Sequence, residues 1–147
     1  MSLHTTSEVI SFVKQLEGKS ANFYENLSQK HAADRDAFLS FAKENQKNVA
    51  QVERAYYSVI TDALESCFAF DINPDEYTFE VPPLDNTSYS QALNKAINIE
   101  ERIVKFYSDA AEQSDALMGD VPIAFKMVAR KRKDRISKLK SLLEVSQ

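Results

Sequence analysis

The sequence predicts a single all-α domain, a four-helix bundle, and three observations favour this fold class. Small or apolar residues recur every three or four positions along four segments, as in helices that bury one face. Only two of the 147 residues are glycine, which leaves few positions for the tight turns of a β-rich fold. The two halves of the chain also repeat each other. The expected elements are a hairpin over about residues 6–66, a crossover over about 67–88 and a hairpin over about 89–146.

The first hairpin begins at a capping box, because Glu8 follows Thr5 at the required spacing. The first helix is expected to end near residue 31, and Asp34 or Asp36 begins the second. The repeating positions are Val9, Val13, Leu16, Ser20, Phe23 and Leu27 in the first helix, and Phe38, Phe41, Ala42, Val49, Val52, Tyr56, Ile60 and Leu64 in the second. The short connection between these helices makes them antiparallel neighbours.

The segment that follows the first hairpin has the composition of a long connection. Its consecutive prolines, Pro82 and Pro83, exclude a helix interior. A connection of this length is expected to carry the chain along the whole bundle. Three aromatic residues in it, Phe70, Tyr77 and Phe79, are expected to pack along the bundle and to offer apolar surface to a second subunit. The sequence therefore predicts a crossover and a homodimer.

The second hairpin has its own helix-start signals. Ser88 and Gln91 form another candidate capping box, and Pro122 suits the first turn of the last helix. The repeating positions are Leu93, Ala96, Ile99, Ile103, Phe106 and Ala110 in the third helix, and Phe125, Val128, Ala129, Ile136, Leu139 and Leu143 in the fourth. The third helix is expected to end near Gln113, and the fourth to run nearly to the last residue.

The repeat relates one carboxylate in each hairpin. Glu17 precedes the pair Phe23-Tyr24 at the same spacing as Glu100 precedes Phe106-Tyr107. The residues three and four positions from Glu100 are all apolar, so its side chain is expected to face the core, and Glu17 occupies the equivalent place. A bare charge there costs several kcal/mol, so each carboxylate needs a metal ion or a cationic side chain as its partner.

Two segments, Glu17-Gly-Lys-Ser20-Ala-Asn-Phe23-Tyr24 and Glu100-Glu-Arg-Ile103-Val-Lys-Phe106-Tyr107, resemble the Glu-x-x-Ala-x-x-Phe-Tyr pattern of the rubrerythrin and ferritin-like family. The resemblance extends over nearly the whole chain and implies a ferritin-like bundle with a di-iron site and an oxidoreductase or iron-handling activity. The family also has Glu-x-x-His on the second helix of each hairpin. In this chain those positions are occupied by Asn45 and Asn48 in one hairpin and by Arg132 and Arg135 in the other.

A charge count predicts that the ligand positions hold no metal. Glu17 and Glu100 balance two arginines, whose guanidinium groups suit buried pairing with carboxylates and would repel a dication. The predicted site is a buried polar network of Glu17, Asn45, Asn48, Glu100, Arg132 and Arg135, with Tyr24 and Tyr107 hydrogen-bonded nearby. The alternative is a weak iron site formed by Glu17, Glu44 and Glu100. His31 lies too far along the first helix to join either site.

The fourth helix carries a surplus of basic residues. With two arginines used internally, Lys126, Arg130, Lys133 and Lys140 remain as an outward row at helical spacing. Because no aromatic residues interleave with them, a solvated face is expected, and nucleic acid or an anionic surface is the alternative ligand.

Location and role follow from what the sequence contains. No apolar segment approaches a membrane span, the first residues do not form a signal peptide, and Cys67 is the only cysteine, so a cytoplasmic protein without a disulfide is expected. The sequence predicts a cofactor-free, non-enzymatic protein that acts by binding a partner protein or by assembling. An oxidoreductase or iron-handling protein with an atypical site is the alternative.

Overall fold

The computed structural model describes the chain except for residues 1, 60–67, 82, 116–118 and 147. The four long helices of this part are α1 (Thr6–Lys30), α2 (Arg35–Val59), α4 (Tyr89–Ser114) and α5 (Asp120–Ser146). Two short 3-10 turns, η1 (Ala32–Asp34) and η2 (Pro74–Glu76), lie in the connections. These bounds agree with the predicted helices. The predicted end of the second helix lies outside the described residues.

Both predicted capping boxes are present and fix where the hairpins begin. The Thr5 side chain accepts a hydrogen bond from the Glu8 backbone amide, and the Glu8 carboxylate accepts one from the Thr5 amide. Ser88 and Gln91 exchange the same pair of bonds at the start of α4. Each box satisfies two amide groups that the first turn of a helix leaves unpaired.

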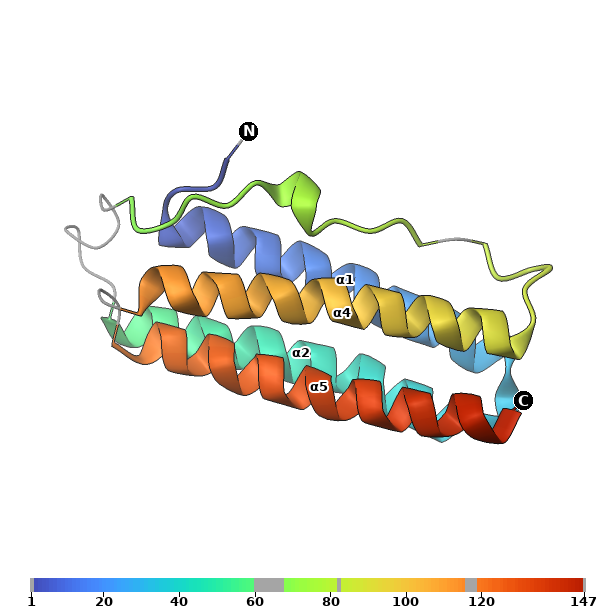
Figure 1. The fold of residues 1–147 in the computed structure, drawn as a ribbon. Coiled ribbons are helices and arrows are strands. Elements are labelled where there is room, and N and C mark those ends of the chain that lie inside the picture. Colours follow the sequence, from blue (N-terminus) through green and yellow to red (C-terminus); the bar gives the residue numbers. More distant parts are fainter. Residues whose placement is uncertain (1, 60–67, 82, 116–118, 147) are drawn as a thin grey trace.

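The four helices pack as a bundle, which confirms the predicted all-α architecture. Figure 1 shows α1 and α2 as one antiparallel hairpin and α4 and α5 as another, with α2 beside α5 and α1 beside α4. The connection from the first hairpin to the second, described over residues 68–81 and 83–88, runs the length of the bundle along the side of α1 and α4 (Figure 1). This crossover makes α4 antiparallel to α1 and brings the middles of all four helices to one level. None of the described helices is long and apolar enough to cross a membrane.

The crossover is hydrogen-bonded to α4 and to the N-terminal segment. The Tyr77 hydroxyl donates a hydrogen bond to Asp109 Oδ2 at 2.6 Å, and Arg102 Nη1 donates to the Thr78 carbonyl at 2.9 Å. Leu3 forms an isolated antiparallel β-bridge with Ile72, which the sequence did not predict. These contacts hold the crossover against the bundle.

The aromatic residues of the crossover point into the bundle. Phe70, Tyr77 and Phe79 are only 2%, 3% and 6% exposed. Tyr77 and Phe70 meet the rings of Phe106 and Phe125 edge-on. The expectation that they offer apolar surface to a second subunit is therefore wrong, because the core of their own chain already covers them.

Candidate functional site: a buried ion-pair network

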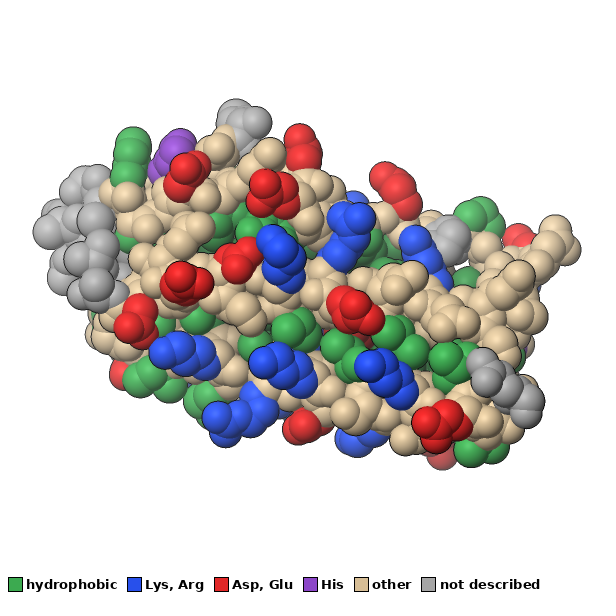
Figure 2. All heavy atoms as spheres, viewed as in Figure 1, with side chains coloured by type: hydrophobic (Ala, Val, Ile, Leu, Met, Phe, Trp, Pro, Cys, Tyr) green, Lys and Arg blue, Asp and Glu red, His purple; other side chains and the backbone are tan. Residues whose placement is uncertain are grey.

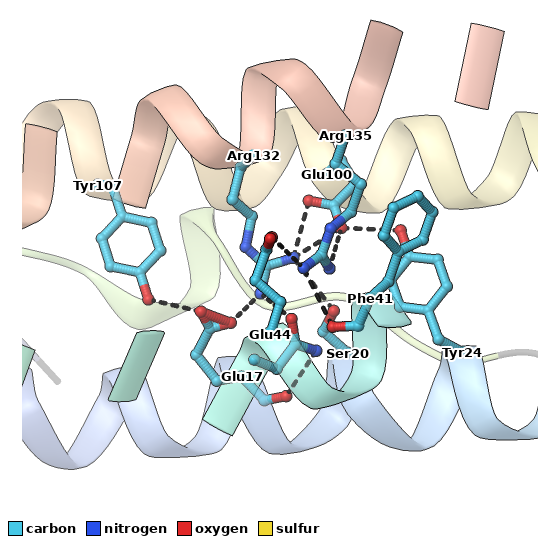
Figure 3. A network of polar contacts seen from close by, with 10 residues as sticks. Glu17, Ser20, Tyr24, Phe41, Glu44, Glu100, Tyr107, Arg132 and Arg135 are labelled. Carbon is cyan, nitrogen blue, oxygen red and sulfur yellow. Dashed lines mark hydrogen bonds and ion pairs between the residues drawn. The ribbon is translucent and has the colours of Figure 1, made fainter. Parts of the chain in front are cut away.

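The helix faces that build the core also carry the polar residues of the candidate site. Glu17 on α1, Asn45 and Asn48 on α2, Glu100 on α4, and Arg132 and Arg135 on α5 occupy inward positions of the apolar pattern, and all are at most 1% exposed. Figure 3 shows Glu17 and Glu100 converging with Arg132 and Arg135 between the helices of both hairpins. The network described below lies entirely at this level.

Arg132 links the two carboxylates that the repeat relates. Its Nη1 donates to both oxygens of Glu100 at 2.6 and 2.8 Å and to Ser20 Oγ at 3.2 Å. Its Nη2 donates to Glu17 Oε2 and to Asn45 Oδ1, the latter at 3.2 Å. One guanidinium therefore ties together side chains from all four helices, as its planar set of donors permits.

Arg135 forms a second centre of ion pairs one turn further along α5. Its Nη1 donates to Glu100 Oε1 at 3.1 Å, and its Nη2 donates to the Phe41 carbonyl at 3.1 Å and to Glu44 Oε1 at 2.9 Å. The guanidinium carbon lies 4.8 Å from the centre of the Phe41 ring and 5.2 Å from that of Tyr24. Cation–π attraction adds to the ion pairs at these distances.

Two tyrosines connect the hairpins crosswise. The Tyr24 hydroxyl on α1 donates to Glu100 Oε1 on α4 at 2.8 Å, and the Tyr107 hydroxyl on α4 donates to Glu17 Oε1 on α1 at 3.1 Å (Figure 3). Burial raises the pKa of both tyrosines well above its ordinary value. Both hydroxyls therefore keep their protons and act as donors to the carboxylates.

The network contains one more carboxylate than the sequence-based count included. Glu44 reaches Arg135 from the edge of α2, so three carboxylates meet two guanidiniums. The Glu44 side chain is 35% exposed, which leaves part of its charge in contact with water. The pKa of Glu100 is raised above its ordinary value of 4.5, chiefly because burial disfavours its charged form. The arrangement is close to neutral in the core and acidic at its rim.

The residues of the alternative iron site do not fit a metal ion. Arg132 lies between Glu17 and Glu100, and Arg135 binds both Glu100 and Glu44, so the candidate ligand oxygens are already directed at cations. A dication in the same space would be repelled by both guanidiniums. Within the described ranges, no group of three or more His, Cys, Asp or Glu side chains has the geometry of a metal site.

Asn45 and Asn48 differ in their hydrogen bonding although both are buried. Asn45 Nδ2 donates to the Glu17 carbonyl at 3.3 Å, and its Oδ1 accepts from Arg132. Neither amide atom of Asn48 has a hydrogen-bond partner among the described residues. The structure therefore places all six predicted residues in the core and connects five of them.

Two groups in the network, the Ser20 hydroxyl and the Phe41 carbonyl, were not predicted from the sequence, and the role of Glu44 was predicted differently. The Ser20 hydroxyl and the Phe41 carbonyl accept hydrogen bonds from the arginines, and both sit at positions of the apolar repeat. A serine among apolar residues was the available signal for the first. The carbonyl carried no signal, because backbone acceptors are common to every residue. Glu44 was considered only as a metal ligand and instead binds Arg135.

The outward basic row lies apart from the network on the other side of α5. Lys126 forms an ion pair with Asp115 at 3.1 Å. Arg130, Lys133 and Lys140 are exposed and have no ion-pair partner among the residues that the structure describes. These three cations remain free for a partner.

Searches of known protein families, curated proteins and solved structures find no match to this chain.

Proposed function

We propose that this chain is a metal-independent member of the rubrerythrin and ferritin-like family that acts by binding a partner protein or by assembling. The ferritin-like assignment is supported by the duplicated hairpin, the long crossover and the carboxylates at equivalent positions of α1 and α4. The observation that carries the proposal is the position of Arg132. Its guanidinium occupies the space between Glu17 and Glu100, which is where inward carboxylates of such a bundle would hold metal.

An ion-pair network in this position has a structural consequence. It joins α5 to the other three helices by charge-assisted hydrogen bonds, which are shorter and stronger than neutral ones. The ion-pair network, which occupies the positions of the family's metal ligands, then fixes how the two hairpins are aligned with each other. In a bundle held in this way, the outer surface is the part that binds a partner protein or a second copy of the chain.

Metal analysis tests the proposal. After expression with added iron, the purified protein should contain far less than one metal ion per chain. Neither a chelator nor ferrous iron should change its melting temperature, because a ligand stabilises a fold only by binding its native state. About two ions per chain, together with a melting temperature raised by iron, would contradict the proposal.

A designed variant provides the positive control for this measurement. The variant carries Asn45→Glu and Asn48→His in the first hairpin, and Arg132→Glu and Arg135→His in the second. These four substitutions restore Glu-x-x-His in both hairpins. This variant should bind iron and should be stabilised by it, since four carboxylates and two histidines then face the centre. Iron binding by this variant would show that the same assay can detect a metal ion in the natural chain.

The free basic residues of α5 make nucleic acid the second ligand to test. We expect only weak, non-specific binding to DNA or RNA, with a dissociation constant no lower than about 10⁻⁶ M at physiological salt. Fluorescence anisotropy with duplex and single-stranded probes measures it. Tighter binding that falls steeply with salt, and that Arg130→Glu and Lys133→Glu abolish, would support a nucleic-acid-binding role instead.

A further inference from the structure

One face of the molecule has α4 at its centre, the crossover on one side and α5 on the other. The crossover side is fixed by the bond from Arg102 to Thr78 and by the bond from Tyr77 to Asp109. On the α5 side, an open groove of about 640 Å³ runs along the surface where α4 packs against α5. In Figure 2 acidic side chains gather along the upper edge, over the crossover, and basic ones along the lower edge, over α5.

The two edges of this face carry opposite charges. Residues 69–87 contain acidic side chains and neither lysine nor arginine. The acidic edge consists of Asp71, Asp75, Glu76 and Glu80, and the basic edge consists of Lys126, Arg130 and Lys133; all seven are exposed. Of the basic edge, only Lys126 has an ion-pair partner among the described residues.

The two sides of α4 carry charges opposite to the edges beside them. Arg102 and Lys105 lie toward the acidic crossover, where Lys105 stands 4.9 Å from the centre of the Tyr77 ring. Glu112 lies toward α5 and lines the groove with the basic edge, and Glu101 lies about three turns away on the same side by helical periodicity. Asp109 also lies on the crossover side of α4, where it pairs with Lys105, so this side keeps a surplus of positive charge. Across the face the net charge therefore changes sign in four rows, negative, positive, negative and positive.

The acidic and basic edges also match in their position along α4. Asp71 lies level with Gln113, to which its backbone is hydrogen-bonded, and Lys126 lies level with Asp115. Tyr77, next to Glu76, lies level with Asp109. Arg130 lines the groove together with Ser108, the neighbour of Asp109 in α4. Asp71 and Glu76 thus have basic counterparts, Lys126 and Arg130, at about the same height on the opposite edge.

We propose that this face binds a second copy of the chain, related by a twofold axis that runs along α4 through the interface. Such a rotation keeps the height along α4 and exchanges the two edges, so each acidic crossover meets the basic edge of the other copy. The two contacts are identical, as a twofold interface requires. An axis across α4 would instead place each row on a row of the same sign, which like-charge repulsion disfavours.

The charged character of the face determines how the dimer should behave. This inference rests on the proposed function, because it names the partner through which the bundle assembles. Exposed ion pairs contribute little individually and are screened by salt, so the association should be moderate and salt-dependent. Analytical ultracentrifugation should show a dimer at about 0.1 M salt and at least tenfold weaker association at about 1 M, where the Debye length falls to about 3 Å.

Two charge-reversal variants identify the face. One carries Lys126→Glu, Arg130→Glu and Lys133→Glu; the other carries Asp75→Lys, Glu76→Lys and Glu80→Lys. Each should be monomeric at about 0.1 M salt, because its two edges now have the same sign. An equimolar mixture should form a heterodimer, since the acidic α5 edge of the first fits the basic crossover of the second while the remaining two edges keep their natural pairing.

A matched control changes the same number of charges elsewhere. Lys43→Glu, Lys47→Glu and Arg54→Glu alter exposed residues of α2, which lies diagonally opposite α4, and should leave the dimer intact. A wild type that is monomeric at low salt, or variants that each still dimerise alone, would overturn the proposed face. Metal content is measured separately, so failure here leaves the metal-independent assignment to its own test.

Discussion

Replacing Arg132 with methionine should lower the free energy of unfolding by about 3–5 kcal/mol, the usual cost of removing one partner of a buried ion pair. Arg132 is fully buried and, within the described part of the chain, supplies the only ion pair of Glu17, whose side chain is 1% exposed. Methionine retains much of the length of the side chain but none of its donors. Among the residues that the structure describes, only the Tyr107 hydroxyl would then remain as a donor to the buried Glu17 charge.

A second substitution separates this electrostatic cost from the loss of packing. Adding Glu17→Gln to Arg132→Met removes the stranded charge while its amide oxygen can still accept from Tyr107. The double variant should therefore be more stable than Arg132→Met alone, in a double-mutant cycle measured by urea unfolding. Lys140→Met, at an exposed position of the same helix outside the charged face, is the control and should change stability by less than about 0.5 kcal/mol. A double variant less stable than Arg132→Met would show that packing dominates.

The same geometry predicts a smaller effect at Glu100. After Glu100→Ala, Arg132 still binds Glu17 and Arg135 still binds Glu44, so neither guanidinium loses every carboxylate. From the sequence, Glu100 was the most conspicuous buried charge because its neighbours are apolar. The structure shows that Arg132 has the central position, since it forms ion pairs with both of the carboxylates that the repeat relates.

The parts of the structure that local patterns determine could be predicted from the sequence. The capping boxes at Thr5 and Ser88 depend on residues three positions apart, and they mark the true helix starts. The repeat likewise indicated which positions face the core, because periodicity fixes the direction of each Cα–Cβ bond. Interaction partners that depend on the reach of a long side chain were harder to predict from the sequence. Glu44 lies one residue from the inward position of Asn45 and still extends to Arg135.

Other contacts between distant segments could not be predicted from the periodic pattern, although the pairing of Glu17 and Glu100 with the arginines of α5 was predicted. The aromatic residues of the crossover suggested spare apolar surface, and only the three-dimensional course of that segment shows Phe106 and Phe125 covering them. Asn48 is a similar case. The repeat places it at the position equivalent to Arg135, but a shorter side chain there does not reach the carboxylates, and periodicity gives no measure of that distance.

Replacing Asn48 with alanine should raise the free energy of unfolding by about 1–3 kcal/mol, the cost of a buried polar group without a hydrogen bond. Asn48 is fully buried, and neither of its amide atoms has a partner among the described residues. Alanine removes both atoms, introduces no overpacking, and favours the helix by roughly 0.5 kcal/mol relative to asparagine.

Asn45 provides a matched comparison one turn away on the same helix. Asn45→Ala removes the same amide from an equally buried site, but this amide accepts a hydrogen bond from Arg132 and donates one to the Glu17 carbonyl. It should therefore lower stability by about 1–3 kcal/mol, because hydrogen bonds to charged groups are the stronger ones. Urea unfolding of both variants at neutral pH should give changes of opposite sign. If Asn48→Ala also destabilises the fold, the packing of the Asn48 side chain, or a water that its amide binds in the core, contributes more to stability than the unpaired amide costs.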